Sequence, residues 1–387
     1  MHSTGDERMT EALSKAEDHS REYSEVLSNL TIVVPTYNRH LQVLKTINFW
    51  RGRGPELLIL DGSPTPLALD QEHESMEGLI YLHIPETFQS RIVQSGTHIT
   101  TDYVALSGDD EVQMPSSLAA SIAELERNAD LASCLGWAVG FSTYVAEGSE
   151  QQLNGYSCYP KLQFLHNTHE SVEHRWYTHL SSYVPSNIYS VVRANAYKNA
   201  LKLIDAPGDR VGGQLELEFE IAILYQGGNK VLPNMHWLRN FGDSSNYTHD
   251  PDNNPAKMFY QCFLSPKLSS WRQEFLSTRA EVLAEIDGQD VKLVRAWLEN
   301  ALQRYSEICD GIYSSNLTTK ERSVRFIRRN LRAAVPAKHR GKVRNLLNLT
   351  RRSDPTLSLQ DMAEELSLLG MNYSEEELQQ VITERLQ

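Results

Sequence analysis

Three adjacent acids follow a short apolar run in the first third of the chain. The run Tyr103–Leu106 leads through Ser107 and a glycine into Asp109, Asp110 and Glu111. Hard divalent cations prefer carboxylate oxygens, and a cation held in this way neutralises a diphosphate as it leaves a substrate. These acids could therefore form a Mg²⁺ or Mn²⁺ site with Asp109 and Asp110 as first ligands and Glu111 as a third candidate, an interpretation that the motifs described below favour. The alternative is a solvated turn after a strand.

A second group of acids has a spacing that suits proton transfer. Glu216, Glu218 and Glu220 alternate within a stretch that predicts a helix over 215–225, ended by Gly227-Gly228. At about 100° per residue, Glu216 and Glu220 share one side of this helix and Glu218 points away. A carboxylate placed here could take a proton from a substrate hydroxyl. The alternative is that the acids are solvated and favoured by the helix dipole.

The elements that must position these acids resemble a parallel sheet. Four apolar runs recur about every 22–27 residues, and helices fit the intervals 39–50 and 87–100. This spacing predicts βαβ units, and an open α/β sheet binds ligands beyond the carboxyl ends of its strands. A further helix is expected over 116–128 with Ser116 or Ser117 as N-cap, a strand or hairpin over 131–145, and irregular loops with short strands over 150–215. The four runs are Leu30–Val34, Leu57–Leu60, Leu79–Ile84 and Tyr103–Leu106.

Four motifs in sequence order resemble glycosyltransferase family 2 and its GT-A-fold relatives. The resemblance covers about residues 29–250, and Ser107 stands where the family has its first acid. It implies a GT-A-like, Rossmann-type, mostly parallel sheet flanked by helices. The motifs are TIVVPTYNR (31–39), LILDGS (58–63), SRIVQSG (90–96) and YVALSGDDE (103–111), the last followed by Met114-Pro115.

The same resemblance assigns roles to individual residues. Asp61 would accept a hydrogen bond from the base, and Arg91 would reach the base or the diphosphate. Asp61 as a turn-forming residue before Gly62, and Arg39 as a surface helix start, are the alternatives. The residues expected around the nucleotide, Asp109 included, are Pro35, Thr36, Tyr37, Arg39, Asp61, Arg91 and Asp109.

The resemblance also implies a catalytic base and a third metal ligand. By motif register Glu216 is the expected base and Glu218 the reserve. Both His236 and His249 follow the base in the chain, and His249 is the better placed as a ligand. A histidine in a loop is more often structural. A cluster of four further histidines, at positions 166, 169, 174 and 179, is interpreted as loop composition.

Composition and charge describe the protein more broadly. The 387 residues are 40% hydrophobic and carry a net charge of −13, which fits a folded, acidic protein and argues against a nucleic-acid binder. Four widely spaced cysteines and a charged N-terminus predict a cytoplasmic protein without disulfides or a signal peptide. We expect an N-terminal helical or flexible extension (1–28), a catalytic domain (29–250) and an α-helical C-terminal region (251–387) whose helices could pair chains into a homo-oligomer.

A basic segment interrupts this acidic chain. Residues 320–352 contain 12 Lys or Arg and one acid, so this segment is +11 and the rest of the chain carries −24. Apolar residues at helical spacing beside arginines suit a helix lying on an anionic membrane surface. The alternative is a helix docked on the acidic catalytic domain. We slightly favour the membrane, which would place the protein peripherally on the inner face of the cell membrane.

Together these features predict an inverting, metal-assisted glycosyltransferase. It would move a hexosyl or related sugar from a nucleotide-diphosphate-sugar donor to a hydroxyl of a glycan or lipid-linked acceptor, in bacterial surface polysaccharide or glycolipid assembly. A non-catalytic sugar- or nucleotide-binding scaffold is one alternative, suggested by Ser107. A sugar nucleotidyltransferase is another, although it would need a glycine-rich phosphate loop that PTYNRH (35–40) does not supply.

Overall fold

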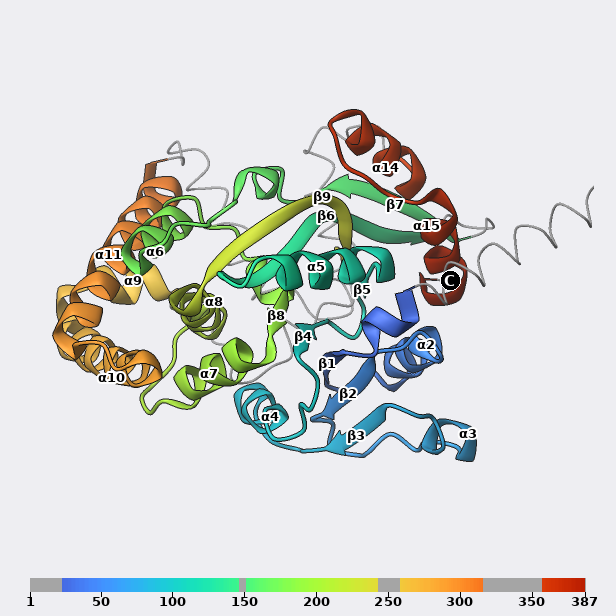
Figure 1. The fold of residues 1–387 in the computed structure, drawn as a ribbon, viewed down its shortest axis with the longest axis horizontal. Coiled ribbons are helices and arrows are strands. Elements are labelled where there is room, and N and C mark those ends of the chain that lie inside the picture. The colour runs from blue at the N-terminus through green and yellow to red at the C-terminus, as the bar shows by residue number, and fades with distance from the viewer. Residues whose placement is uncertain (1–22, 146–150, 243–257, 316–356, 387) are drawn as a thin grey trace, which may run out of the picture.

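The four apolar runs form the parallel half of one nine-stranded sheet (Figure 1). The computed structural model describes residues 23–145, 151–242, 258–315 and 357–386. Strands β1, β2, β3 and β4 lie in the order β3-β2-β1-β4, and each pair is parallel. Parallel strands end at the same edge, so the residues that follow them meet there. The strands are β1 (Leu30–Thr36), β2 (Glu56–Asp61), β3 (Leu79–His83) and β4 (Tyr103–Leu106).

The sheet continues beyond β4 with mixed strand directions. In the order β4-β8-β6-β9-β5, β8 is antiparallel to β4 and β6, β9 is parallel to β6, and β5 is antiparallel to β9. A further strand, β7, pairs with β6 alone. The expected α/β fold class is thereby confirmed. The strands are β5 (Val112–Gln113), β6 (Leu131–Val145), β7 (Gln151–Ser157), β8 (Val191–Arg193) and β9 (Gly228–Asn240).

Helices cover both faces of this sheet, which explains why the strands are apolar throughout. In β1, Val33 belongs to a core cluster shared with α7 and α8, whereas Ile32 and Val34 belong to one shared with α2 and α5. The helical segments are α2 (His40–Trp50), α3 (Gln71–Glu74), α4 (Phe88–Ser95), α5 (Pro115–Arg127), α6 (Val172–Ser181), α7 (Ala194–Asp205) and α8 (Gln214–Gln226), with 3₁₀ turns at Leu162–Phe164 and Asn187–Tyr189.

Two local predictions are wrong. The segment 150–215, expected to hold irregular loops and short strands, contains the strands β7 and β8 but also the helices α6 and α7. The latter buries Tyr197, Leu201 and Ile204 at helical spacing, a pattern obscured by the many aromatic residues nearby. The N-cap of α5 is Met114 and not a serine, because Pro115 fits the first helical turn, where its missing N–H costs nothing.

The C-terminal region is helical, as expected. Its α10 continues to Asp287 and stops at Gly288, whose φ of 74° suits glycine. The elements are α9 (Phe259–Leu264), a 3₁₀ turn (Pro266–Leu268), α10 (Ser269–Asp287), α11 (Val291–Ser315), α14 (Leu359–Leu368), α15 (Glu375–Val381) and a π-helical turn (Ile382–Leu386).

These C-terminal elements pack at opposite ends of the sheet (Figure 1). At one end α11 packs on α6 and α9, and α14 lies against β7 at the other. The last turn contacts α2, and its Leu386 shares a core cluster with Val34 of β1. The expected domain boundary near 250–256 and the basic segment 320–352 lie outside the described residues, as do residues 1–22. Among the described helices, none has the length and hydropathy needed to cross a bilayer.

Candidate active site

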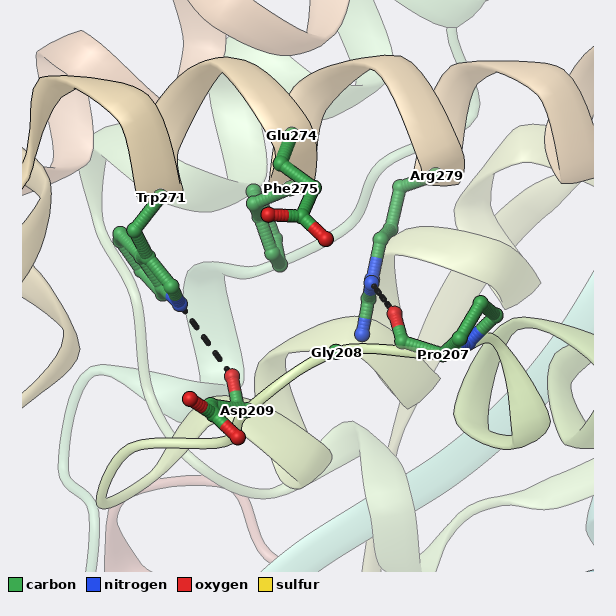
Figure 2. Close-up of a pocket in the computed structure, with 7 residues that line it drawn as sticks. All are labelled: Pro207, Gly208, Asp209, Trp271, Glu274, Phe275 and Arg279. Atoms are coloured by element: carbon green, nitrogen blue, oxygen red, sulfur yellow. Dashed lines mark hydrogen bonds between the residues drawn. The ribbon is translucent and has the colours of Figure 1, made fainter.

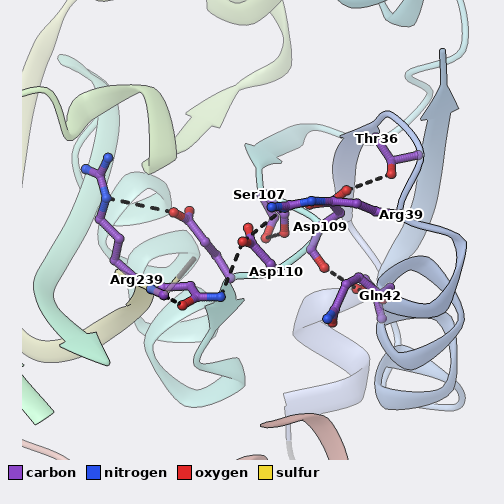
Figure 3. Close-up of polar contacts among 12 residues, drawn as sticks. Thr36, Arg39, Gln42, Ser107, Asp109, Asp110 and Arg239 are labelled. Atoms are coloured by element: carbon purple, nitrogen blue, oxygen red, sulfur yellow. Dashed lines mark hydrogen bonds and ion pairs between the residues drawn. The ribbon is translucent and has the colours of Figure 1, made fainter. Parts of the chain in front are cut away.

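The carboxyl ends of β1 and β4 bring Thr36 and Asp109 together (Figure 3). Thr36 Oγ1 donates to Asp109 Oδ2 at 2.6 Å, and Arg39 Nη1, at the start of α2, donates to Asp109 Oδ1 at 2.6 Å. Asp109 is 4% exposed. Burial raises the pKa of Asp109 above its usual value, and the charge of Arg39 opposes that rise. Both oxygens of this carboxylate are therefore occupied by protein donors.

Arg39 bridges two acids. Its Nη1 lies 3.0 Å from Asp110 Oδ2 as well as 2.6 Å from Asp109 Oδ1. Asn240 Nδ2, at the end of β9, donates to the same Asp110 oxygen at 3.3 Å. Although burial would lower it, the two carboxylates raise the pKa of Arg39 above its usual value, so the guanidinium stays charged. Its Nη2 is buried and has no hydrogen-bond partner among the described residues.

A second arginine reaches the same loop from the C-terminal end of the chain. Arg385 Nη2 donates to the backbone carbonyl of Asp109, and its Nη1 donates to Gln42 Oε1 on α2 at 3.3 Å. Burial lowers the pKa of Arg385 to about 10, while Asp109 and Asp110 act in the opposite direction. The side chain is thus still charged at neutral pH. Sequence reasoning missed it because the two partners lie 276 residues apart.

Glu111 turns away from this pair of acids, toward β9. Its Oε2 accepts from Trp237 Nε1 at 2.9 Å, and Arg239 Nε lies 3.9 Å from its Oε1. Burial and the charge of Asp110 raise the pKa of Glu111 to about 8. Trp237 also stacks on Tyr189 with ring centroids 4.0 Å apart, which holds the Glu111 partner in place.

The donor set does not fit the predicted metal site. Arg39 already lies between Asp109 and Asp110, and Glu111 is engaged by Trp237. Within the described ranges, no three His, Cys, Asp or Glu side chains are grouped to hold a cation. The fourth predicted ligand, His249, lies outside those ranges.

Asp61, at the end of β2, is saturated by protein donors. Its Oδ1 accepts from the backbone N–H of Ser63 at 2.8 Å and from the Ser63 hydroxyl. Its Oδ2 accepts from Tyr81 at 2.6 Å and lies 3.3 Å from His40 Nε2. Burial alone would raise the pKa of Asp61, but these hydrogen bonds hold it below its usual value. This geometry favours the turn-forming alternative.

The remaining predicted nucleotide residues surround the same loops. Arg91 is 5% exposed and donates to the carbonyl of Glu86 at 2.9 Å. Its guanidinium lies directly against Gly62: a Cβ there would come within 1.3 Å of Arg91 Nη1. Pro35, near the end of β1, and Tyr37, between β1 and α2, are both half-buried. The polar residues predicted at the strand ends therefore lie near one another. The guanidinium of Arg91, however, is packed against Gly62.

On α8, Glu216 faces other acids. Its carboxylate is half-buried, and burial together with the charges of Glu220 and Glu111 raises its pKa to about 8. Glu220, one turn further along, is fully buried, with its Oε2 2.6 Å from His179 Nε2 on α6. The predicted side-sharing of Glu216 and Glu220 is confirmed by this proximity. A group with these properties can accept a proton near neutral pH.

Glu218 occupies the opposite side of α8, as predicted, and is enclosed by cations. Arg279 Nε donates to its Oε1 at 2.7 Å, and Arg210 Nε lies 3.3 Å from its Oε2. Gln214 Nε2 donates to Oε1 at 2.8 Å, and Glu218 is 1% exposed. Beside this cluster lies a pocket of about 160 Å³ in which Arg279 also donates to the carbonyl of Pro207 (Figure 2). The contacts indicate a structural ion pair.

Helix α6 fixes α8 in position. Arg175 donates to the carbonyls of Leu224 and Tyr225 at 2.6 and 2.8 Å, and Trp176 Nε1 donates to the carbonyl of Ile221 at 2.9 Å. His179, interpreted from the sequence as loop composition, lies one turn further along this buried face. Its spacing of three from Trp176 was the signal that could have identified it.

His236 is also structural. It is 1% exposed, with Nδ1 2.9 Å from Ser117 Oγ and Nε2 3.3 Å from the Tyr189 carbonyl. Burial lowers the pKa of His236 to about 4, so the ring is neutral at physiological pH. It holds the start of α5 against the sheet.

Comparison with known proteins adds no family assignment. No protein-family model matches the sequence, and no curated protein is significantly similar to it. Solved structures of Staphylococcus aureus TarS are similar in part. TarS residues 1–349 in complex with UDP-GlcNAc are 12% identical, with a TM-score of 0.46 over 76% of this chain and 77% of that one.

Two further TarS structures give similar values. The complex of residues 1–349 with UDP is 13% identical, with a TM-score of 0.44 over 76% of each chain. TarS itself is 14% identical, with a TM-score of 0.45 over 76% of this chain and 46% of that one. Likeness at this level carries no argument about function. The fold and site define an α/β protein with a cluster of charged residues at the carboxyl ends of its parallel strands.

Proposed function

We propose that the protein is a glycosyltransferase that moves a sugar from a nucleotide-diphosphate sugar to a hydroxyl acceptor with inversion. The observation that carries the proposal is that the acids near the β4–β5 loop (residues 107–111) lie in two different electrostatic environments. Asp109 and Asp110 are held by arginines at the strand ends, whereas Glu216 has a pKa of about 8. An inverting transfer needs such a pair of regions: one for the leaving diphosphate and one for the proton.

In this reaction Glu216 is the general base. The acceptor hydroxyl gives its proton to Glu216 while its oxygen forms a bond to the anomeric carbon. The bond from that carbon to the phosphate oxygen breaks, and its electron pair leaves with the nucleoside diphosphate. The charge of Glu111 contributes to the raised pKa of Glu216, which supports a location of this base near the β4–β5 loop. Glu218, enclosed by Arg279 and Arg210, is a positioning residue for α8.

The nucleotide would lie over the ends of β1 and β2. Pro35, Tyr37 and Thr36 would line the base and ribose, as the sequence motif implies. Because Asp61 already accepts from Ser63 and Tyr81, we assign it the role of shaping the loop that receives the base.

Several finer predictions stay predictions. They are the Mg²⁺ or Mn²⁺ cofactor, the hexosyl specificity, the glycan or lipid-linked acceptor and the bacterial surface-glycan setting. The cytoplasmic location, the membrane contact through 320–352 and the homo-oligomer belong with them.

A non-catalytic nucleotide- or sugar-binding protein is the second candidate. The specific observation that favours it is the neutralisation of Asp109 and Asp110 by Arg39 and Arg385, since a compensated acid pair is well suited to binding alone. This alternative does not explain why Glu216 is kept at a raised pKa.

The deciding experiment follows nucleoside diphosphate release from a panel of UDP-, dTDP- and GDP-sugars, with and without simple glycan acceptors. Thermal shift with the free nucleotides reports binding. We expect one donor to bind and to turn over, and Glu216→Gln to lower turnover by about 10²–10⁴ while leaving the shift intact. The matched control is Glu285→Gln on the exposed face of α10, which should behave as wild type.

Binding without release across all donors and acceptors would favour the non-catalytic protein. Absence of both binding and release would refute the nucleotide site itself.

A further inference from the structure

The acid pair of the β4–β5 loop is electrically balanced by the protein. Asp109 and Asp110 contribute two negative charges, and Arg39 and Arg385 contribute two positive ones. Ser107, 5% exposed, stands in the same loop and adds no charge. A divalent cation entering this group would add two positive charges next to two guanidinium groups. Sites for such cations normally have an excess of carboxylate instead.

The geometry also leaves no free carboxylate edge between these acids. Asp109 uses Oδ2 for Thr36 and Oδ1 for Arg39, each at 2.6 Å. Arg39 Nη1 lies 3.0 Å from Asp110 Oδ2, so one nitrogen stands between the two carboxylates. Figure 3 shows Arg39 extending from the start of α2 across the loop that carries Ser107, Asp109 and Asp110. A metal bound to both acids would have to displace this guanidinium.

Arg39 has an unused donor at this position. Its Nη2 is buried and has no hydrogen-bond partner among the described residues. A buried N–H group without a partner is unfavourable and calls for an explanation, such as a water or an ion that pairs with it. The side chains of Arg39, Asp110 and His40 are 11%, 14% and 35% exposed, so solvent reaches the edge of this group, while Nη2 itself is covered. A guanidinium with a free N–H pairs well with a phosphate oxygen.

We propose that Arg39 is the cation of this site, takes the place of a divalent metal, and binds the diphosphate of the donor through Nη2. The inference rests on the proposed glycosyl transfer and specifies how the leaving group is stabilised. As the bond between the anomeric carbon and the phosphate oxygen breaks, the electron pair stays on that oxygen and Arg39 stabilises the added charge. No proton moves at this end, because the acceptor proton goes to Glu216. Asp109 and Asp110 hold the guanidinium in place.

The binding test uses inorganic pyrophosphate and MnCl₂ on chelator-treated, full-length protein. Calorimetry should show pyrophosphate binding to wild type without metal. Arg39→Gln should weaken that binding by about tenfold or more, the usual loss for one charge-assisted hydrogen bond. Titration with MnCl₂ followed by electron paramagnetic resonance should show no tight Mn²⁺ binding to wild type. Arg39→Gln should bind Mn²⁺ more tightly, because the guanidinium no longer lies between Asp109 and Asp110. Arg39→Lys, which keeps the charge, should retain part of the pyrophosphate affinity and gain no manganese site.

The matched control is Arg127→Gln on α5, where the side chain is 69% exposed. It should match wild type in both titrations. Tight manganese binding by wild type, or unchanged pyrophosphate binding by Arg39→Gln with a normal circular dichroism spectrum, would overturn the inference.

Turnover separates this inference from the proposed function. Donor turnover that persists in EDTA supports Arg39 as the cation. Turnover that EDTA abolishes and Mn²⁺ restores would overturn this inference and leave the glycosyltransferase intact. No turnover of any donor would instead count against the proposed function.

Discussion

Asp109 and Asp110 on one side of the site and Glu216 on the other are acids in opposite environments. The first two share Arg39, and Arg385 contacts the same loop, so their charge is compensated. The charges that act on Glu216 are those of Glu220 and Glu111, and they raise its pKa to about 8. The β4–β5 loop links the two regions, because it carries Asp109 and Asp110 as well as Glu111, whose charge acts on Glu216.

The difference separates binding from proton transfer. An acid paired with arginine is useful for holding a group in place. An acid whose pKa lies near the working pH can gain and lose a proton at small cost. Glu218 shows that sequence position alone does not decide this, because it lies two residues from Glu216 and is compensated by Arg279 and Arg210.

The largest effect, on the free energy of unfolding, is expected from removing Arg279, one of the two cations that compensate the charge of Glu218. Arg279→Leu leaves this carboxylate, 1% exposed, with Arg210 as its remaining cation, and removes a donor to the Pro207 carbonyl. Removing one partner of a buried ion pair usually costs about 3–5 kcal/mol of unfolding free energy. Urea unfolding followed by tryptophan fluorescence measures the loss.

Two further variants serve as controls for this experiment. Glu218→Leu combined with Arg279→Leu should recover part of the loss, since the undercompensated buried carboxylate is removed. Arg210, the other cation of Glu218, keeps its hydrogen bonds to the carbonyls of Ile204 and Ala206. Arg304→Leu on the exposed side of α11 should stay within about 0.5 kcal/mol of wild type. If Arg279→Leu were as stable as Arg304→Leu, the compensated description of Glu218 would be wrong.

A smaller effect on stability, of opposite sign, is expected from Glu216→Gln. Its folded-state pKa of about 8 exceeds the ordinary value of 4.5, so between these pH values the folded protein holds a proton that the unfolded chain releases. The stability from this group is fully present below about pH 4.5 and is lost as pH rises through about 8. Glu216→Gln should therefore melt at the wild-type temperature at low pH and higher at pH 8.

The expected difference in melting temperature between Glu216→Gln and wild type at pH 8 corresponds to about 1–3 kcal/mol of unfolding free energy. This is the usual cost of a poorly satisfied buried group. For a protein of 387 residues that is about 1 °C for each kcal/mol. Scanning calorimetry across this pH range measures it, with Glu285→Gln as the control that should show no gap. A gap that is constant with pH would mean that Glu216 does not titrate as described.

Much of this fold could be predicted from local sequence. The runs that became β1 to β4 are apolar on both faces, which only a covered parallel strand needs, and each ends where a polar motif begins. The side-sharing of Glu216 and Glu220 followed from helical geometry alone. Such features depend on residues close in the chain.

What lies against those residues could not be predicted in this way. The sequence shows the carboxylates of Asp109 and Asp110, but not that Arg39 folds back between them. Arg385 reaches the same loop across 276 positions, and no periodicity records that contact. The predicted cation ligands are therefore visible in the sequence, whereas the arginines that compensate their charge are not.

The smallest effect, and the most specific, is expected from Glu220→Gln. The charge of Glu220 is the largest contribution to the raised pKa of Glu216 after burial. Glutamine keeps the shape and can still pair with His179, so α8 should stay in place. Other groups near Glu216 are Glu111, Tyr183 and Tyr189, none of which changes. Removing the charge should lower the pKa of Glu216.

Because the base must be unprotonated to act, the acidic limb of the pH profile of kcat/KM should move to lower pH in Glu220→Gln, by about one unit or less. Activity below pH 7 should rise relative to wild type. Glu285→Gln should leave the limb where it is. A limb that stays fixed in Glu220→Gln, in a protein with unchanged melting behaviour, would show that another group supplies the base, and the contrast between the two acidic regions would then lose its catalytic meaning.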